Sequence, residues 1–327
     1  MLEITPENAA PYLRAQGLAT IDQRVDVQAL GWGVSNVVMR ANRQGQPPLV
    51  LKQSREQLRT KAAWFSRLDR IWTETAALRM LETVVGTGIV PRVVFEDREN
   101  YLFAMSCAPD ESVVWKEQLL AGEADPNVAA QAGQILAAFH TVRPSPASPL
   151  GDREVFDQLR IDPFYRWILP AHPKLSDAID HLITSMTIAD PRFVHADFSP
   201  KNILVHTQGL TIVDFETAHL GDPAFDLGFF LSHLVLKALM ATPDHERYLD
   251  LTRAFWTAYG SGDRELIARS IQHTAACGLA RVDGKSPVDY LDEPRREATR
   301  VMMTRALLDP PQHWSDFLDL FIRTLPG

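Results

Sequence analysis

The sequence predicts an α+β fold in which a strand-rich N-terminal part precedes a mostly helical C-terminal part. Short β-type segments and one helical stretch alternate up to about residue 108. From residue 126 onwards most apolar residues recur at helical spacing, apart from a strand pair around residues 193–214. The length of 327 residues is enough for two domains or two lobes. We therefore divide the chain into an N-terminal lobe over residues 1–108 and a C-terminal lobe over residues 109–327.

The N-terminal part is expected to combine two helices with a set of strands. Thr5 can cap a helix within residues 1–20, and Pro6 suits its first position. A second helix is expected over residues 61–84, because apolar side chains recur there at helical spacing, and Gly86 would end it. Strands are expected over residues 25–30, 36–41, 49–52, 92–96 and 101–105.

The C-terminal part is expected to contain one deeply buried helix among others. Helical spacing is clear over residues 126–140 and 175–187. The most apolar segment covers residues 225–240, but three polar or charged side chains interrupt it. It is also shorter than the ~20 residues that a membrane span needs. We therefore interpret it as a core helix, and we expect no membrane association.

The composition is that of an ordinary soluble globular protein. Hydrophobic residues make up 46% of the chain and charged residues 23%. Cys107 and Cys277 are its only cysteines, and their spacing fits neither a metal site nor a disulfide framework. The N-terminus lacks the basic and apolar regions of a secretory signal. These features favour a cytoplasmic location.

The distribution of charge allows two interpretations. The net charge of −8 argues against a nucleic-acid binder, which usually has a basic face. Residues 1–108 hold 13 Lys/Arg and 11 Asp/Glu, a net +2, whereas the remainder holds 20 and 30, a net −10. The simpler interpretation is a solvated acidic surface. The sharper one is that the second part attracts a cationic substrate.

The residues that carry chemistry lie around a predicted hairpin. Asn202 follows Asp197 by five positions, and Asp214 follows after a further twelve. Strands over residues 203–206 and 210–213, joined by a turn, would bring Asn202 and Asp214 side by side. Two oxygen ligands suit a hard cation such as Mg²⁺, which takes water and phosphate oxygens for the rest of its shell. Asp197 would lie at the mouth of that site, free to accept a proton from a hydroxyl or amine.

Four weaker features precede and follow this hairpin. The segment over residues 31–36 has two glycines between strands, where the backbone can approach phosphates closely, although a plain turn is the simpler explanation. Lys52 ends an apolar strand and Glu74 falls on the next helix, and such residues are usually exposed to solvent. Asp226 begins the apolar helix, where it either has buried partners or caps the N-terminus.

In this order, the features resemble those of the aminoglycoside phosphotransferase and choline kinase-type family of small-molecule kinases, with methylthioribose kinases close by. The resemblance is carried by HADFSPKNIL at residues 195–204, IVDFE at 212–216 and GDPAFDL at 221–227. It spans roughly residues 25–240. It implies a bilobal, protein-kinase-like fold, the cofactors ATP and Mg²⁺, and transfer of a phosphoryl group to a small-molecule acceptor.

The resemblance also implies roles for individual residues. Asp197 would be the catalytic base, while Asn202 and Asp214 would hold magnesium. Lys52 would contact the phosphates while paired to Glu74. The glycine-rich loop and the hinge would bind the rest of the nucleotide through Gly31, Gly33, Ser35, Asn36, Met105, Ser106 and Ala108.

Further residues have a less certain place in the pattern. Glu216 stands where protein kinases carry Gly, and it would either join the metal shell or act structurally. Asp226 would brace the catalytic loop, and His195 is interpreted as a structural brace of that loop. Lys201 could reach a transferring phosphate or lie on the surface.

The acceptor is not specified by these motifs. Residues 115–122 look similar to a segment of methylthioribose kinases, but the paired arginines that such kinases use on the sugar are not evident near residues 275–281. Arg281, Asp283, Lys285 and Tyr290 are candidate acceptor contacts in a loop with Gly and Pro. The acidic second part favours a cationic amino alcohol or aminoglycoside, and the alternative is a neutral thio-sugar.

Two other functions are alternatives to the kinase. A nucleotide-binding pseudokinase usually lacks the base or a metal ligand, whereas Asp197, Asn202 and Asp214 are all present. A metal-dependent hydrolase that uses His195, Asp197 and His206 would leave the glycine-rich loop unexplained.

Overall fold

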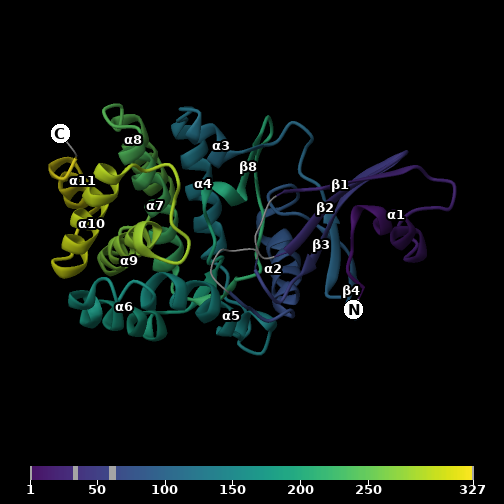
Figure 1. The fold of residues 1–327 in the computed structure, drawn as a ribbon, viewed down its shortest axis with the longest axis horizontal. Helices are drawn as coiled ribbons and strands as arrows, with labels where there is room; N and C mark the ends of the chain where they lie inside the picture. Colours follow the sequence, from purple (N-terminus) through teal and green to yellow (C-terminus); the bar gives the residue numbers. More distant parts are fainter. Residues whose placement is uncertain (1, 32–35, 59–63, 326–327) are drawn as a thin grey trace.

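The N-terminal part is a five-stranded antiparallel sheet with a helix on each face. The computed structural model describes residues 2–31, 36–58 and 64–325. The strand order is β1-β2-β3-β5-β4, and the sheet lies at one end of the molecule in Figure 1. Its elements are α1 (Pro6–Ala15), β1 (Val25–Ala29), β2 (Asn36–Arg43), β3 (Gln46–Ser54), α2 (Arg70–Val85), β4 (Val93–Asp97) and β5 (Leu102–Ser106).

Successive side chains along a strand point to opposite faces of the sheet, and each face packs against a different helix. Met39, Leu51 and Ala104 point to one face and pack in one apolar cluster with Leu13 of α1. Phe103, next to Ala104, points to the other face and belongs to the main core together with α2. The sheet is thereby buried on both sides, which fixes its strands relative to α2.

Helix α2 begins nine residues later than the sequence pattern predicts, at Arg70. Trp64 is one of the apolar residues within the helix predicted over residues 61–84. In the structure it packs in a separate cluster with Leu58 and Leu159. Its indole Nε1 donates to the carbonyl of Gln158 at 3.0 Å. The apolar spacing before residue 70 therefore reflects contacts with the C-terminal part and not a helix face.

The C-terminal part is mostly helical, as the sequence predicts, and three short strand pairings accompany the helices. Figure 1 shows its last helices at the end of the molecule opposite the sheet. Its elements are β6 (Val113–Val114), α3 (Trp115–Leu120), α4 (Pro126–Phe139), η1 (Pro149–Gly151), α5 (Glu154–Phe156), η2 (Asp157–Arg166), η3 (Pro173–Leu175), α6 (Ser176–Ile188), β7 (Arg192–Val194), η4 (Pro200–Asn202), β8 (Ile203–His206), β9 (Gly209–Ile212), β10 (His219–Gly221), α7 (Pro223–Met240), α8 (Glu246–Tyr259), α9 (Arg264–Asp283), α10 (Glu293–Leu308) and α11 (Trp314–Arg323).

Helix α7 is the central helix of this part. It begins at Pro223 because the side chain of Asp222 accepts a hydrogen bond from the backbone N–H of Ala224 at 3.0 Å. Gly228 allows α9 to approach closely, since a Cβ there would lie 2.3 Å from the Cβ of His273. Within the described residues, α7 alone is long and apolar enough to cross a membrane, yet 94% of it is buried inside the fold. The prediction of a core helix is confirmed.

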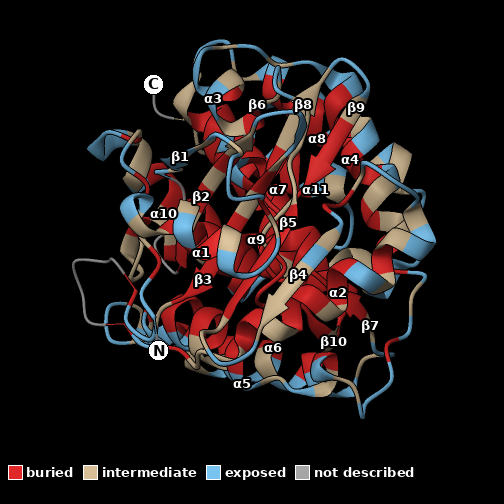
Figure 2. Cartoon of the chain, turned by 90° about the vertical axis from the view of Figure 1, so that its right-hand side faces the viewer, coloured by how far each residue is buried: buried red, intermediate tan, exposed pale blue. Residues whose placement is uncertain are grey.

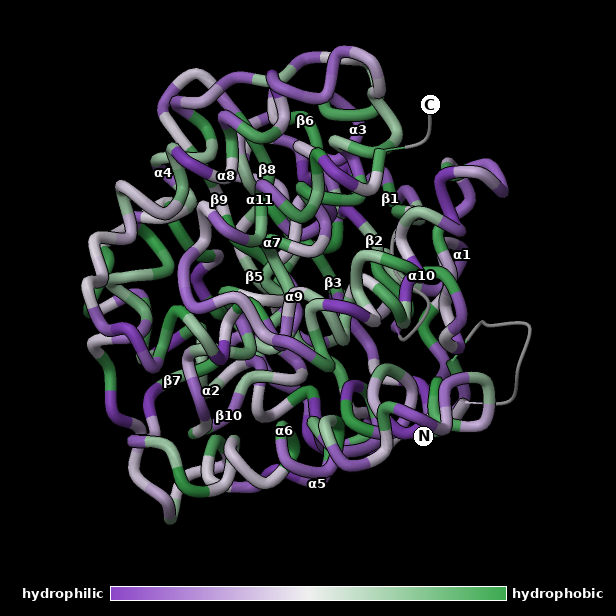
Figure 3. The backbone as a smooth tube through the Cα atoms, turned by 90° about the vertical axis from the view of Figure 1, so that its left-hand side faces the viewer, coloured by the Kyte–Doolittle hydropathy of each residue, from purple (hydrophilic) through white to green (hydrophobic). Residues whose placement is uncertain are grey.

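The main core continues from α2 and the sheet into the helical part. Buried residues fill the centre in Figure 2, while exposed ones lie on the outer loops and outward helix faces. Figure 3 likewise shows hydrophobic stretches around β5, β8 and α7 in the interior. The mixed, protein-kinase-like architecture is confirmed. The division of the chain at residue 108 stays a prediction, although the five-stranded sheet does end at Ser106.

Candidate active site

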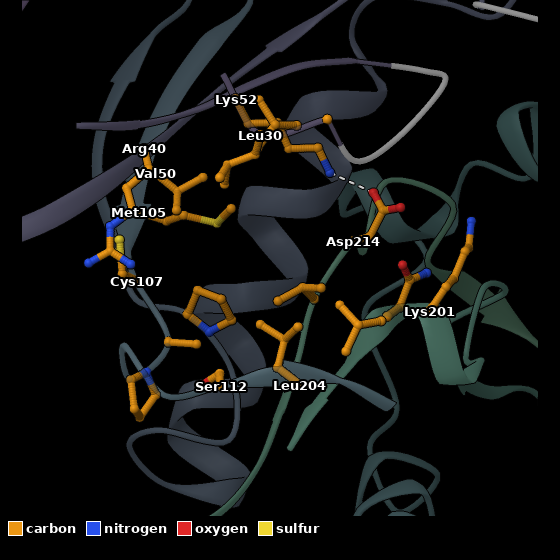
Figure 4. Close-up of a pocket in the computed structure, with 18 of the residues that line it drawn as sticks. Leu30, Arg40, Val50, Lys52, Met105, Cys107, Ser112, Lys201, Leu204 and Asp214 are labelled. Atoms are coloured by element: carbon orange, nitrogen blue, oxygen red, sulfur yellow. Dashed lines mark hydrogen bonds and ion pairs between the residues drawn. The ribbon is translucent and has the colours of Figure 1, made fainter. Parts of the chain in front are cut away.

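A cavity of ≈ 560 Å³ lies between the sheet and the β8–β9 hairpin. Figure 4 shows Leu30, Val50 and Met105 of the N-terminal part on one side, facing Leu204 of β8. Lys52 and Asp214 close one end of the cavity. The cavity therefore has apolar sides, which suit a flat ring, and a charged end, which suits phosphates.

The predicted hinge forms the rim of this cavity. Met105 is 6% exposed, and it lines the cavity together with Ser106 and Ala108. The Ser106 side chain accepts a hydrogen bond from the Arg92 N–H at 2.9 Å, which fixes the end of β5. Within the described residues, the N–H groups of Cys107 and Ala108 donate to no protein acceptor. These two groups are available to a bound ring.

The predicted glycine-rich loop is described only at its two ends. Gly31 lines the cavity, and Gly33 and Ser35 lie outside the described residues. Asn36 is 3% exposed and begins β2. Its Nδ2 donates to Glu216 Oε2 at 2.7 Å, so this side chain joins the N-terminal sheet to the segment after the hairpin.

Lys52 lies between two carboxylates, as its predicted role requires. Its Nζ is 2.6 Å from Glu74 Oε2 and 2.6 Å from Asp214 Oδ1. Burial acts to lower the pKa of Lys52, but Asp214 and Glu74 outweigh it and raise that pKa above its usual value. Burial is also the largest influence on Glu74, and it raises the pKa of this carboxyl to about 7. Lys52 therefore stays charged, and helix α2 is tied to the hairpin.

The hairpin brings Asn202 and Asp214 together as predicted. Ile203 pairs with Ile212 across β8 and β9, and the Val213 N–H donates to the Asn202 carbonyl at 3.0 Å. The Asn202 Nδ2 donates to the Asp197 backbone carbonyl at 2.9 Å and to Asp197 Oδ2 at 2.8 Å. Both of these bonds use Nδ2, and Asn202 Oδ1 accepts no hydrogen bond from any residue that the structure describes.

Asp197 is held by cations on both oxygens. Arg160 Nη2 lies 2.8 Å from Asp197 Oδ1, and Lys201 Nζ lies 2.8 Å from Asp197 Oδ2. Burial raises the pKa of Asp197, but Arg160 and then Lys201 outweigh it and lower that pKa to about 2. Asp197 is therefore ionised at neutral pH. Oδ1 has the smaller number of partners and keeps a lone pair for a hydroxyl.

The loop before Asp197 is braced by Asp226. The backbone N–H groups of His195 and Ala196 donate to the two oxygens of Asp226 at 2.7 Å each. Ala196 has a φ of 60°, which is unusual for a residue with a Cβ. Asp226 thus braces the loop, as the resemblance implied, and Asp222 supplies the helix cap instead.

His195 has the geometry of a structural brace. Its Nδ1 accepts from the Asp197 N–H at 3.1 Å, and its Nε2 lies 3.2 Å from the Val213 carbonyl, to which it can donate. Burial is the main cause that lowers the pKa of His195. The ring is therefore neutral, and both nitrogens are used by the backbone.

Asn202 and Asp214 are the side chains at the charged end that fit a hard cation. Both line the cavity, and they offer an amide and a carboxylate oxygen. Within the described residues no three His, Cys, Asp or Glu side chains are grouped to hold a metal. Such a sparse set fits a cation that takes its other ligands from phosphate and water. Glu216 Oε2 lies 2.9 Å from Arg70 Nε, and its place in the metal shell stays a prediction.

Comparison with known proteins agrees with this geometry. The model of the phosphotransferase enzyme family matches residues 26–266, more than half of the chain. The chain belongs to the phosphotransferase enzyme family. It is therefore a phosphotransferase of small molecules.

Individual relatives of this phosphotransferase are distant. A methylthioribose kinase of Exiguobacterium sibiricum is 24% identical over 299 residues, which cover 81% of this chain and 75% of that protein. An amicoumacin kinase solved with AMP-PNP and Ca²⁺ has a TM-score of 0.60 at 15% identity, covering 97% and 100% of the two chains. A choline/ethanolamine kinase family protein from Mesorhizobium loti has a TM-score of 0.54 at 18% identity, covering 98% and 99%.

The predicted acceptor contacts of this phosphotransferase do not form one loop. Arg281 and Asp283 lie in the last turn of α9, because the helix continues to Asp283. Asp283 is engaged by Arg300 at 3.0 Å and by His172 at 2.8 Å. Lys285 Nζ lies 5.2 Å from the centre of the Trp64 ring. Asp283 therefore serves a structural ion-pair network, while Arg281 lies near Asp197.

Sequence reasoning missed Arg160, the closest cation to Asp197 Oδ1. It comes from η2, a π-helical segment 37 residues before Asp197. Arg160 is 8% exposed, and its Nε donates to the carbonyl of Ala196. A π-helical turn is often found at functional sites, but nothing in the spacing of this segment distinguishes Arg160 from a surface arginine.

Proposed function

We propose that this phosphotransferase is an ATP- and Mg²⁺-dependent kinase that transfers the γ-phosphoryl group to a hydroxyl of a small molecule, with Asp197 as the catalytic base. The observation that carries the proposal is the arrangement of the cavity. Its hinge end has free backbone groups, and its other end gathers Lys52, Asp214, Asn202 and Lys201. The lobes expected over residues 1–108 and 109–327 would close on the nucleotide.

The apolar side chains would hold the adenine ring. Leu30, Val50 and Met105 would contact one face and Leu204 the other. The Ala108 N–H would supply a hydrogen bond at the rim. Lys52 would hold the α- and β-phosphates, and the contact that it now makes with Asp214 would be shared with them.

Asn202 and Asp214 would hold Mg²⁺ at the charged end. A bound magnesium ion would neutralise charge on the phosphates. The pKa of Asp214 is consistent with such a ligand: burial raises it, but Lys52 and Lys201 outweigh burial and keep it lowered. We assign Glu216 to the link between Arg70 and Asn36 rather than to the metal.

The chemical step requires positioning and little covalent chemistry from the protein. The acceptor oxygen forms a bond to the γ-phosphorus, and the bond from this phosphorus to the β,γ-bridging oxygen breaks, so that ADP leaves. Asp197 Oδ1 accepts a hydrogen bond from the hydroxyl and takes its proton as the new bond forms. Because Asp197 is ionised well below neutral pH, it is ready for this role without prior deprotonation.

The proposal is tested by measuring acceptor-dependent release of ADP and formation of a phosphorylated product by ³¹P NMR. Wild type should turn over with at least one hydroxyl compound and only when Mg²⁺ is present, whereas Asp197→Ala should bind ATP without turnover. Nucleotide binding with no product from any acceptor would identify a pseudokinase instead.

A further inference from the structure

A group of basic side chains extends from Asp197, which Arg160 and Lys201 contact, to one face of helix α7. Its members come from elements that are far apart in the sequence, namely α3, η2, η4, α7 and α9. We call it the cationic cluster. It consists of Lys116, Arg160, Lys201, Lys237 and Arg281, and His233 lies among them, although burial lowers the pKa of His233 well below its usual value.

One face of α7 contributes the deepest part of the cluster. Phe229, His233 and Lys237 are spaced four residues apart, so they lie on the same side of the helix. His233 is 6% exposed and Lys237 is 1% exposed. Lys237 Nζ has a hydrogen bond of 3.5 Å to the His233 carbonyl and lies 5.3 Å from the centre of the Tyr290 ring.

Two arginines connect this helix face to Asp197. Arg160, which contacts Asp197, lies 5.4 Å from the Phe229 ring centre and 5.9 Å from the Phe164 ring centre. Arg281 lies 5.3 Å from the same Phe164 ring. Arg281 Nη2 lies 3.5 Å from His233 Nε2. The cluster is therefore continuous from Asp197 to α7.

Lys116 and Lys201 connect the cluster to the nucleotide cavity. Both line that cavity, near its charged end in the case of Lys201. Lys116 is also close enough to influence the pKa of both His233 and Lys237. Lys116 and Lys201 thus place one edge of the cluster at the nucleotide cavity, and Lys201 also contacts Asp197.

The cluster has fewer carboxylates than cations. Asp197 pairs with Arg160 and Lys201. Among the described residues, no carboxylate lies within 4.0 Å of Lys116, Lys237 or Arg281. In the part of the chain that the structure describes, the Arg281 Nε and the Tyr290 hydroxyl are buried without a hydrogen-bond partner, whereas Arg281 Nη1 donates to the Ser286 carbonyl at 2.9 Å. Buried charges and donors of this kind are costly unless another group compensates them.

The pKa of Lys237 reflects this lack of compensation. Burial is the largest cause, and Lys116 and Arg281 add to it, lowering the pKa of Lys237 to about 7. Burial likewise lowers the pKa of Arg281. An anion placed between these side chains would favour their charged forms.

We propose that the acceptor carries an anionic group, a carboxylate or a phosphate ester, which binds Lys237 and Arg281 and directs the hydroxyl of the same molecule towards Asp197. This inference rests on the proposed kinase function and names the acceptor class for that site. It replaces the cationic acceptor that the net charge of the second part favoured. That charge of −10 is a sum over the whole C-terminal part, whereas the charged side chains that contact the two Asp197 oxygens are Arg160 and Lys201.

The first test measures binding and does not depend on turnover. Wild type with Mg²⁺ and AMP-PNP is titrated with malate and with glycerol 3-phosphate, which represent the two anionic groups. Lys237→Met should weaken binding of the preferred anion by at least about tenfold, since a charge-assisted contact is lost. The matched control Lys174→Met removes one exposed positive charge outside the cluster and should bind like wild type. Equal anion binding by wild type and Lys237→Met would overturn the inference.

The second test compares acceptor classes by turnover. Hydroxy acids, sugar phosphates, choline, aminoglycosides and neutral sugars are assayed with ATP, and an anionic class should be phosphorylated best. Lys237→Met should raise the KM for that acceptor while leaving the KM for ATP unchanged. If a cationic or neutral compound is the best acceptor and is insensitive to Lys237→Met, the anionic inference fails and the kinase function stands. If no compound is phosphorylated, the kinase function fails, and the binding test decides on the anion site.

Discussion

Lys52 Nζ lies 2.6 Å from Glu74 Oε2 on helix α2 and 2.6 Å from Asp214 Oδ1 after the β8–β9 hairpin. One ammonium group thereby joins the N-terminal part to the residue that we assign to the metal. The side chains of Lys52 and Glu74 are 5% and 1% exposed, so neither charge can be compensated by water if the other is removed.

Lys52→Met should lower both stability and nucleotide affinity. Removing one partner of a buried pair costs about 3–5 kcal/mol, because the remaining charge is left uncompensated. Lys52→Met leaves the carboxylates of Glu74 and Asp214 without their cation. The double variant Lys52→Met/Glu74→Gln also removes the Glu74 charge, so it should recover part of the lost stability without recovering nucleotide binding. Urea denaturation and nucleotide titration measure the two effects separately. Full nucleotide affinity in the double variant would contradict a phosphate contact by Lys52.

Asp197→Ala should abolish phosphoryl transfer while ATP affinity stays nearly intact. General-base assistance contributes ~10²–10⁴ in rate, and lost positioning of the acceptor adds to this. The measurement is kcat with saturating acceptor beside a separate nucleotide titration. A loss of less than about tenfold would rule out the assignment of the base.

Asp214→Asn should weaken binding of Mg²⁺-ATP more than binding of metal-free ATP. The variant keeps the size of the side chain but removes the negative charge that a hard cation prefers. Nucleotide is titrated with Mg²⁺ and with a chelator present. Equal losses in the two titrations would mean that Asp214 acts only through Lys52.

Arg160→Met should move the acid limb of the kcat/KM profile to higher pH. Arg160 is the largest of the influences that lower the pKa of Asp197, and burial acts in the opposite direction. Without Arg160 the carboxylate therefore takes up its proton at a higher pH, so activity is lost earlier on acidification. Arg160→Lys keeps the charge and should restore part of the profile. If Arg160→Met lowers kcat but leaves the acidic side of the kcat/KM profile at the same pH, Arg160 has only a structural role.

The sequence predicted the parts of this site that depend on local spacing. The strands expected over residues 203–206 and 210–213 bring Asn202 and Asp214 together at the open end of one hairpin, and the structure forms this hairpin with a turn one residue shorter, so that Ile203 pairs with Ile212. Lys52 and Glu74 were expected from their order on a strand and a helix, and the ion pair between them agrees with that expectation. Each of these relationships can be predicted once a single hairpin, or a single strand followed by a helix, is predicted correctly.

The parts that depend on tertiary packing could not be predicted in this way. Arg160 and Lys237 belong to one cluster only because η2 and α7 both pack against α9. A whole-lobe count of charge could not show which charges contact Asp197, where the structure places Arg160 and Lys201. The start of α2 was also misplaced, because Trp64 packs against Leu159 and not on a helix face.

Lys237→Met should make the protein more stable at neutral pH, with a gain that shrinks as pH rises. The usual lysine pKa is 10.5, and burial lowers that of Lys237 to about 7. Between these values the unfolded chain binds a proton that the folded protein releases, so the wild type gains stability as pH rises from about 7 to about 10. The penalty for the charged, buried lysine is therefore complete below about pH 7, on the order of 5 kcal/mol, and it is relieved near pH 10.

Replacement by Met keeps the length of the side chain and removes this penalty. The difference in unfolding free energy between Lys237→Met and wild type is measured by urea denaturation at neutral and at alkaline pH, so that other titrating groups cancel. Lys174→Met should show no gain at either pH. A stabilised variant that has lost anion binding would show that the buried lysine is retained for the acceptor at a cost in stability. A gain independent of pH would mean that the folded protein does not lower the pKa of Lys237, and a loss of stability would mean that its ammonium already has a compensating partner.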